Sequence, residues 1–255
     1  MSRSIAEASP NCWENVRLIA TDMDGTLTRE GKFTTELLQS LEKIAQTEID
    51  IIIVTGRSAG WVEAVAHYLP VQGAIAENGG LFYDNQSLTS RLTTAIDNID
   101  LHRQQLAQTF QLLQSKLPHL KESRDNRFRL TDWTFDVAEL TTTELELIDN
   151  ICQQEGWSFT YSTVQCHIKP LGQDKAIALE SVLSQYFPQL QSTQVVTVGD
   201  SPNDVSLFDA NKFPLSVGVA NVLHYREQLE HQPTYVTSKA EVEGFNELVE
   251  SIVSS

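Results

Sequence analysis

The chain has 255 residues, of which 41% are hydrophobic, so it can bury one large core or two unequal ones and does not have the composition of a disordered protein. It carries 34 Asp and Glu residues against 18 Lys and Arg residues, a formal net charge of −16. Such a negative surface argues against nucleic acid and anionic membranes as partners. Any site for a small anion therefore needs a local positive charge, from a metal ion or from a basic cluster.

The first stretch, residues 1–14, has no periodic pattern, and we expect a frayed tail without the apolar segment of a secretory signal. The three cysteines, Cys12, Cys152 and Cys166, match no zinc motif, so we expect free thiols in a reducing compartment. The aliphatic run 49–54 contains Asp50 and is too short to cross a bilayer. These features predict a soluble, cytoplasmic protein.

Short apolar runs alternate with helical stretches in the first part of the chain. We expect strands over 16–21, 49–54 and 73–76, and helices over 34–47 and 58–68. The first helix places Leu37, Leu41 and Ile44 on one face, with Thr34 or Thr35 as its cap. Alternation of this kind is typical of βαβ units and a parallel sheet that is buried on both faces.

The middle of the chain, residues 84–169, has a different order of elements. We expect helices over 101–117 and 141–155, the second with a capping box from Thr141 to Glu144. Strands are expected over 128–130, 134–137, 157–161 and 165–168. The order αββαββ predicts a small α+β module.

The alternation of strand and helix returns after this module. We expect helices over 174–187, 202–210 and 240–252, and strands over 194–198 and 215–219. The sequence therefore predicts an α/β fold in which residues 15–83 and 170–255 form a Rossmann-like core with a parallel sheet, and residues 84–169 form an inserted domain.

Acidic residues follow two of the predicted core strands at the point where each strand ends. Asp22 and Asp24 come directly after the first strand and point the same way along an extended chain, and Gly25 allows a sharp turn. Asp200 and Asp204 follow the strand 194–198. Ligands bind at the carboxyl ends of strands in open α/β sheets, so we expect these carboxylates to converge there. An oxygen-rich cluster of this kind is suited to Mg²⁺.

Two further segments extend this site. Thr55, Gly56 and Arg57 follow the strand 49–54 at the same predicted edge. Lys175 lies in the first turn of the helix 174–187, where a cation opposes the helix dipole, so local stability does not explain it. Each segment alone is more often a solvated turn or a helix cap. Together and in this order they favour a functional site.

The set resembles the four motifs of the haloacid dehalogenase superfamily, with 22–26 similar to the first motif, Thr55 to the second, Lys175 to the third and 199–204 to the fourth. The insert lies between the second and third motifs and resembles the type IIB cap of that superfamily. Asn78-Gly79-Gly80 resembles the Asn-Gly turn common in these proteins. The resemblance covers about 15–83 and 170–255.

The resemblance implies a role for each matched residue. Asp22 is the nucleophile that forms an aspartyl-phosphate, Asp24 is the general acid and base, Thr55 binds a phosphoryl oxygen, and Lys175 orients Asp22. It implies Mg²⁺ bound by Asp22, the main-chain carbonyl of Asp24, Asp200 and Asp204. Substrate-binding residues are expected among Gly56, Arg57, Asn78, His167, Lys169, Lys175 and Asn203.

The resemblance implies a phosphatase that acts on a small phosphorylated metabolite, and similarity to sucrose-phosphate and mannosylphosphoglycerate phosphatases favours a sugar phosphate. Two alternatives stay open, a phosphohexomutase and a non-catalytic protein that binds a phosphometabolite. A basic cluster in the insert is either an anion-binding wall or a solvated surface, and consists of Lys116, Lys121, Arg124, Arg127 and Arg129. The expected oligomeric state is a monomer or a weak homodimer.

Overall fold

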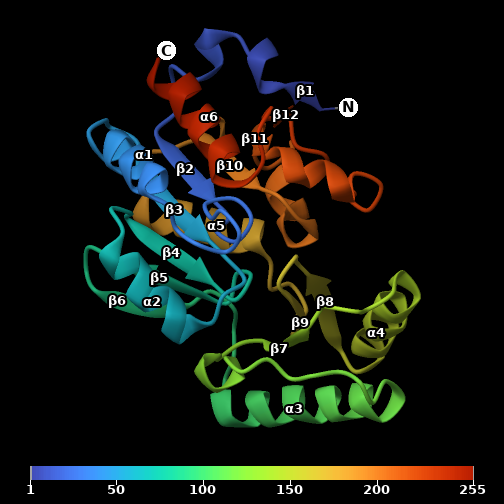
Figure 1. Cartoon of the computed structure of the whole chain (residues 1–255). Helices are drawn as coiled ribbons and strands as arrows, with labels where there is room; N and C mark the ends of the chain where they lie inside the picture. The colour runs from blue at the N-terminus through green and yellow to red at the C-terminus, as the bar shows by residue number, and fades with distance from the viewer. Residues whose placement is uncertain (1, 255) are drawn as a thin grey trace.

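The computed structural model describes residues 2–254, and a nine-stranded sheet dominates it (Figure 1). The strand order is β1-β12-β11-β10-β2-β3-β4-β5-β6, and neighbours run parallel except in the two pairs that involve β5. The strands are β1 Arg3–Ser4, β2 Leu18–Thr21, β3 Asp50–Val54, β4 Gly73–Ala76, β5 Leu81–Asp84, β6 Thr89–Leu92, β10 Val195–Gly199, β11 Leu215–Gly218 and β12 Tyr235–Val236.

Helices cover both faces of this sheet. One face packs against α1 (Thr35–Ala45), α2 (Ala59–Tyr68) and α6 (Glu241–Val253), and the other packs against α5 (Lys175–Tyr186). Alternate residues of a strand therefore enter different cores: Ile19 belongs to the first, and Leu18 and Ala20 to the second. This explains why the central strands are apolar at nearly every position.

Short 3₁₀ helices complete the core: η1 Ile5–Glu7, η2 Pro10–Cys12, η4 Ser192–Gln194, η5 Pro202–Phe208 and η6 Ala220–Tyr225. The segment 202–210, expected to form a regular helix, is thus the 3₁₀ helix η5. The side chains of Ser201 and Asp204 hold its first turn in a capping box.

A second unit, which we call the cap, lies at the edge of the core where the arrows of β2 and β3 end (Figure 1). It has its own apolar core, which includes Leu106, Phe110 and Phe135. Its three-stranded antiparallel sheet has the order β7-β9-β8. The elements are α3 Ile99–Lys116, η3 Asn126–Phe128, β7 Trp133–Asp136, α4 Thr142–Gln154, β8 Trp157–Tyr161 and β9 Gln165–Pro170.

The prediction of a strand over 128–130 is wrong. In the segment before β7, Glu122 forms an isolated β-bridge to Phe135, and the chain then turns through η3. The side chain of Asn126 causes this turn, because its amide donates to the carbonyl oxygen of Thr134 at 2.7 Å and its oxygen accepts from the nitrogen of Thr134 at 2.8 Å. The residues after η3 leave the cap sheet and reach the core instead.

The boundaries of the core differ from those expected at two places. Arg3–Ser4 pairs with β12, and Ile5 and Trp13 are buried, so the first residues are packed against the sheet and do not fray. The sheet also continues past residue 83, because β6 pairs with β5 through Leu92. An edge strand with two exposed residues followed by two half-buried ones carries little apolar signal, which explains why the sequence pattern does not reveal β6.

No helix within residues 2–254 is both long and apolar enough to cross a membrane.

Candidate active site

Three neighbouring strands bring the polar segments together at one edge of the sheet. Thr21, the last residue of β2, is in register with Val198 of β10 and with Ile53 of β3. The nitrogen of Asp22 donates to the carbonyl oxygen of Val198 at 2.8 Å, which fixes the start of the following loop. The segments that begin at Asp22, Thr55 and Asp200 therefore leave the sheet side by side.

Lys175 lies at the centre of this edge. Its Nζ is 2.6 Å from Oδ1 of Asp22 and 2.6 Å from Oδ1 of Asp204, and its side chain is fully buried. Asp174 caps the helix by accepting from the nitrogens of Ala176 and Ile177. The two carboxylates raise the pKa of the Lys175 ammonium above its usual value despite burial. The ammonium thus stays charged beside Asp22.

Asp22, Asp200 and Asp204 form a cluster in which one oxygen of each residue lies within 4.8 Å of the others. Burial raises the pKa of the Asp22 carboxyl well above its usual value, and repulsion by Asp204 adds to this although Lys175 opposes it. Burial also raises the pKa of the Asp200 carboxyl, and repulsion by Asp22 and Asp204 adds to this although Lys175 opposes it. Three buried carboxylates thus face one ammonium, and a divalent cation would offset the remaining negative charge. The all-oxygen donor set fits Mg²⁺.

The two carboxylates in the loop after β10, Asp200 and Asp204, have different hydrogen-bond partners. Oδ2 of Asp204 accepts from the nitrogens of Asp200 and Ser201, and its Oδ1 binds Lys175, so Asp204 shapes the loop and holds the lysine. A Cβ at Gly199 would lie 2.6 Å from the Asp204 side chain, so this close approach requires glycine. Asp200 has no such contact with Lys175 and accepts from the side chains of Thr26 and Asn221, so it is the carboxylate of this loop that would bind a cation.

Asp24 and Arg57 form a bidentate ion pair. Nε of Arg57 lies 2.8 Å from Oδ2 of Asp24, and its Nη2 lies 2.6 Å from Oδ1. The Asp24 side chain is 16% exposed and that of Arg57 is 30% exposed. A paired geometry of this kind fixes the orientation of a carboxylate more strictly than a single contact does.

The family resemblance assigns proton transfer to Asp24, so we expect Arg57→Ala to lower kcat by about tenfold to a hundredfold, because a mobile carboxyl group transfers protons less efficiently. Arg57→Lys should restore only part of the loss, because an ammonium cannot form both bonds at once. Steady-state phosphate release measures the effect. Arg29→Ala, which removes an exposed ion pair with Glu243, is the control, and an Arg57→Ala enzyme as active as this control would contradict the prediction.

Thr55, Asn78 and Asn203 form a second connected group. The nitrogen of Asn78 donates to the carbonyl oxygen of Thr55 at 3.0 Å, and Nδ2 of Asn203 donates to Oδ1 of Asn78 at 3.0 Å. Nδ2 of Asn78 is buried and has no hydrogen-bond partner within residues 2–254. This amide is therefore a free donor beside Gly56.

A small cavity lies between these core residues and the cap. Its volume is about 10 Å³, which is room for about one water-sized sphere. Asp22, Asp24, Thr55, Gly56, Arg57, Ser201 and Asn203 line it from the core, and Ser162, Val164, Gln165 and His167 line it from the cap. The cap is therefore closed over the carboxylates, and a substrate larger than the cavity requires it to move.

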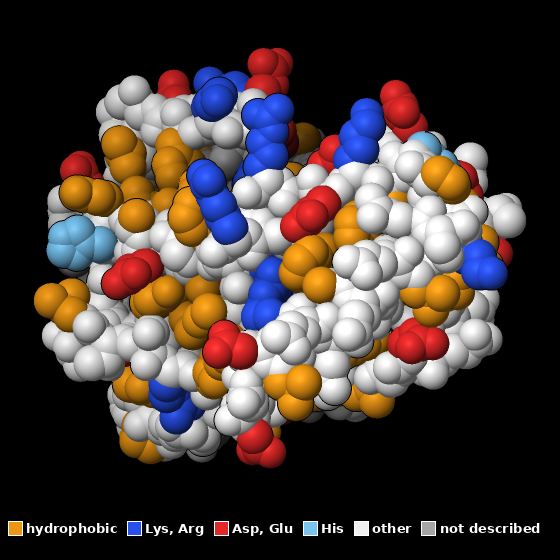
Figure 2. All heavy atoms as spheres, turned by 90° about the horizontal axis from the view of Figure 1, so that it is seen from below, with side chains coloured by type: hydrophobic (Ala, Val, Ile, Leu, Met, Phe, Trp, Pro, Cys, Tyr) orange, Lys and Arg blue, Asp and Glu red, His pale blue; other side chains and the backbone are white. Residues whose placement is uncertain are grey.

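Two groups of predicted residues lie away from this cavity. The Lys169 ammonium donates to the carbonyl oxygen of Gln173 and does not line the cavity. In the basic cluster, Arg129 is buried, and the other four residues are exposed and outside the cavity. Figure 2, which views the molecule from below, shows Lys and Arg side chains interspersed with Asp and Glu. The geometry therefore favours a solvated surface for these four.

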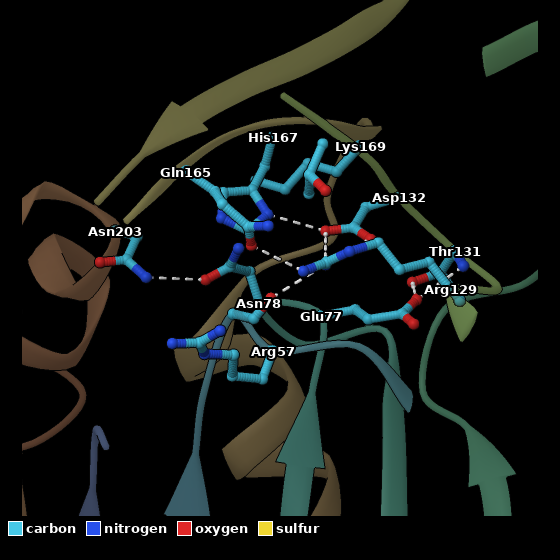
Figure 3. A network of polar contacts seen from close by, with 12 residues as sticks. Arg57, Glu77, Asn78, Arg129, Thr131, Asp132, Gln165, His167, Lys169 and Asn203 are labelled. Atoms are coloured by element: carbon cyan, nitrogen blue, oxygen red, sulfur yellow. Dashed lines mark hydrogen bonds and ion pairs between the residues drawn. The ribbon is translucent and has the colours of Figure 1, made fainter. Parts of the chain in front are cut away.

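Sequence reasoning missed a buried polar network between core and cap (Figure 3). Glu77 accepts from the nitrogens of Ala59, Leu130 and Thr131 and from the Thr131 hydroxyl. The guanidinium of Arg129 donates to the carbonyl oxygen of Gly56 at 2.9 Å and to Asp132. Glu77 and the 129–132 segment are far apart in sequence, and no local pattern indicates that they meet.

Asn221 was also missed, although one signal could have found it. Its Nδ2 donates to Oδ2 of Asp200 at 2.8 Å and to the carbonyl oxygen of Gly25 at 3.1 Å, so it orients the Asp200 carboxylate. It follows β11, the parallel neighbour of β10. The rule that ligands bind at the carboxyl ends of parallel strands therefore applies to Asn221 as well.

Comparisons with known proteins agree with this geometry. A family model described as sucrose-6F-phosphate phosphohydrolase matches residues 15–251. The phosphoglycolate phosphatase of Methanothrix thermoacetophila is 27% identical over 250 residues, which cover 92% of this chain and 96% of that relative. Phosphoglycolate phosphatase 1 of Saccharolobus solfataricus is 25% identical and covers 93% of this chain and 96% of its own length.

Two solved structures share the fold. A Thermoplasma acidophilum protein has a TM-score of 0.75 at 21% identity and covers 93% of this chain and 98% of its own. The C-terminal domain of C. albicans trehalose-6-phosphate phosphatase has a TM-score of 0.74 at 14% identity, with 100% and 98% covered. The expected α/β core with an inserted cap is confirmed. Because the family model spans nearly the whole chain, the protein belongs to the sucrose-6F-phosphate phosphohydrolase family of haloacid dehalogenase-like phosphatases and is a phosphoric monoester hydrolase.

Proposed function

We propose that this protein is a Mg²⁺-dependent phosphatase that hydrolyses a small phosphorylated metabolite through an aspartyl-phosphate at Asp22. The observation that carries the proposal is the buried ion pair of Asp22 with Lys175, placed beside Asp24 at the cavity. Asp22 has one oxygen bound to the lysine, which leaves the other for attack on phosphorus.

The reaction has two displacements. In the first, an oxygen of Asp22 bonds to phosphorus, the ester bond to the leaving group breaks, and Asp24 gives its proton to the leaving oxygen. In the second, Asp24 takes a proton from water, the water oxygen bonds to phosphorus, and the bond to Asp22 breaks to release phosphate. Thr55 and the free amide of Asn78 would hold phosphoryl oxygens, and Lys175 offsets charge near Asp22. When bound, Mg²⁺ would add positive charge at the transferring phosphoryl group, held by Asp22, Asp200 and the Asp24 carbonyl, with Asp204 in support.

The substrate class that we propose first is a sugar phosphate. The matched family model and the trehalose-6-phosphate phosphatase fold support it. The curated relatives support phosphoglycolate as a second candidate, and the guanidinium of Arg57 in the cavity suits a carboxylate. A mutase would return phosphate to the sugar, and a regulatory protein would bind without turnover.

The experiment is phosphate release from a panel containing sucrose 6-phosphate, trehalose 6-phosphate, hexose phosphates and phosphoglycolate, each with Mg²⁺ and with EDTA. We expect release with Mg²⁺ and its loss with EDTA, because the surplus charge of the carboxylate cluster disfavours an anionic substrate without a cation. Release that persists in EDTA would contradict the metal requirement. Isomerised sugar phosphate without free phosphate would favour the mutase.

We also propose that the protein acts in the cytoplasm as a monomer or a weak homodimer. The three cysteines support a reducing compartment, because all are free and Cys152 and Cys166 are buried.

A further inference from the structure

One histidine of the cap lies inside the site and is held from behind by a carboxylate. His167 on β9 lines the cavity and is 1% exposed. Its Nδ1 lies 2.8 Å from Oδ2 of Asp132, which is itself fully buried (Figure 3). A Cβ built at Gly56 would lie 3.1 Å from Cε1 of His167, so the imidazole lies directly over the core loop that follows β3.

The hydrogen-bond chemistry of Asp132 fixes the position of the imidazole proton. Nη1 of Arg129 donates to both oxygens of Asp132, at 2.9 and 3.0 Å, which keeps this carboxylate ionised. An ionised carboxylate only accepts hydrogen bonds, so Nδ1 of His167 must be the donor. In a neutral imidazole, Nε2 then carries a lone pair and no proton.

Burial and two neighbouring cations favour the neutral imidazole of His167. Asp132 is already paired with Arg129, which Asp125 shares at 2.9 Å, and a proton on His167 would be repelled by Arg129 and Lys175. Burial lowers the pKa of His167 below its usual value, and the attraction of Asp132 only partly opposes this. Nε2 has no hydrogen-bond partner within the described residues 2–254.

We propose that Nε2 of His167 accepts a hydrogen bond from a hydroxyl of the substrate's leaving group, and that this contact selects hydroxyl-bearing phosphate esters over esters that carry a carboxylate there. The proposal rests on the proposed phosphatase function and narrows its substrate class. A carboxylate would place a second lone pair against Nε2, whereas a sugar or polyol supplies the missing proton. Asp132 and Arg129 are positioning residues, because they act through His167.

The test uses three esters that differ only at one end: 2-hydroxyethyl phosphate, ethyl phosphate and phosphoglycolate. With the full chain and Mg²⁺, we expect kcat/KM for the hydroxyl ester to exceed the other two by about tenfold or more, since one buried hydrogen bond is involved. In His167→Phe, kcat/KM for the hydroxyl ester should fall about tenfold further than that for ethyl phosphate. Equal losses on both esters, or a preference of the unmodified enzyme for phosphoglycolate, would overturn the proposal.

Two controls separate this proposal from the proposed function and from a folding defect. Hydrolysis of p-nitrophenyl phosphate by the unmodified enzyme tests the phosphatase alone, and its failure would refute that function whatever His167 does. Nitrogen-15 NMR of the unmodified protein reports the tautomer without a variant. We expect a proton on Nδ1 and none on Nε2 at neutral pH, and a mixed tautomer in Asp132→Asn. A proton on Nε2 in the unmodified protein would overturn the proposal.

Discussion

Asp22→Asn should lower kcat by about four orders of magnitude or more, the largest loss that we expect from any single substitution. An amide oxygen is a poor nucleophile toward phosphorus, and an amide cannot match the ammonium of Lys175 at 2.6 Å as a carboxylate does. Phosphate release measures the loss. Acid-quenched mass spectrometry of the unmodified enzyme during turnover should place a phosphoryl group on Asp22.

Asp50→Asn is the matched control, because Asp50 begins β3 at the end of the sheet opposite the cavity. We expect it to keep near-normal turnover. Thermal unfolding of both variants shows whether each is folded. Full activity in a folded Asp22→Asn protein would remove Asp22 as the nucleophile, and with it the two-step mechanism.

Lys175→Met should destabilise the metal-free protein by about 3–5 kcal/mol, because it leaves Asp22 and Asp204 as buried charges without their partner. The pKa of Lys175 is raised on folding, so its stabilising contribution is complete below the unfolded value of 10.5 and is lost only at higher pH. Lys175 is therefore charged at both pH 7 and pH 9, and the cost should be no smaller at pH 9, where the carboxylates left behind are more fully ionised. Urea unfolding in EDTA at both values measures it.

Lys212→Met provides the comparison on the surface. Lys212 pairs with Glu180 at 3.2 Å, and both side chains are partly exposed, so we expect a cost of about 0–1 kcal/mol. A similarly small cost for Lys175→Met would show that the buried ion pairs do not hold the loop after β10 in place.

The core of the site could be predicted because one rule placed its residues. Asp22, Thr55 and Asp200 each follow an apolar strand, and parallel strands end at the same edge. Lys175 was found because it opposes the dipole of its own helix. The positions of the strand ends were therefore enough to predict that these residues meet, although they are far apart in sequence.

The contacts of the cap could not be predicted in the same way. In the sequence, Arg129 belongs to the basic cluster of the insert, yet its side chain is buried against Asp132 and Gly56. A strand was expected over 128–130, but two hydrogen bonds between the Asn126 side chain and the Thr134 backbone turn the chain first. Both outcomes depend on partners that are distant in sequence, and periodicity carries no information about such partners.

The carboxylate of Glu77 has a consequence for how often the enzyme can turn over. It accepts hydrogen bonds from the backbone nitrogens of Leu130 and Thr131, so the cap cannot lift away from the core without breaking these hydrogen bonds. The amide hydrogens of these two residues are therefore exchangeable with solvent only in the lifted state. Under conditions in which every opening leads to exchange, their exchange rate equals the rate of domain opening, and product that needs the lifted cap cannot leave faster than the cap opens.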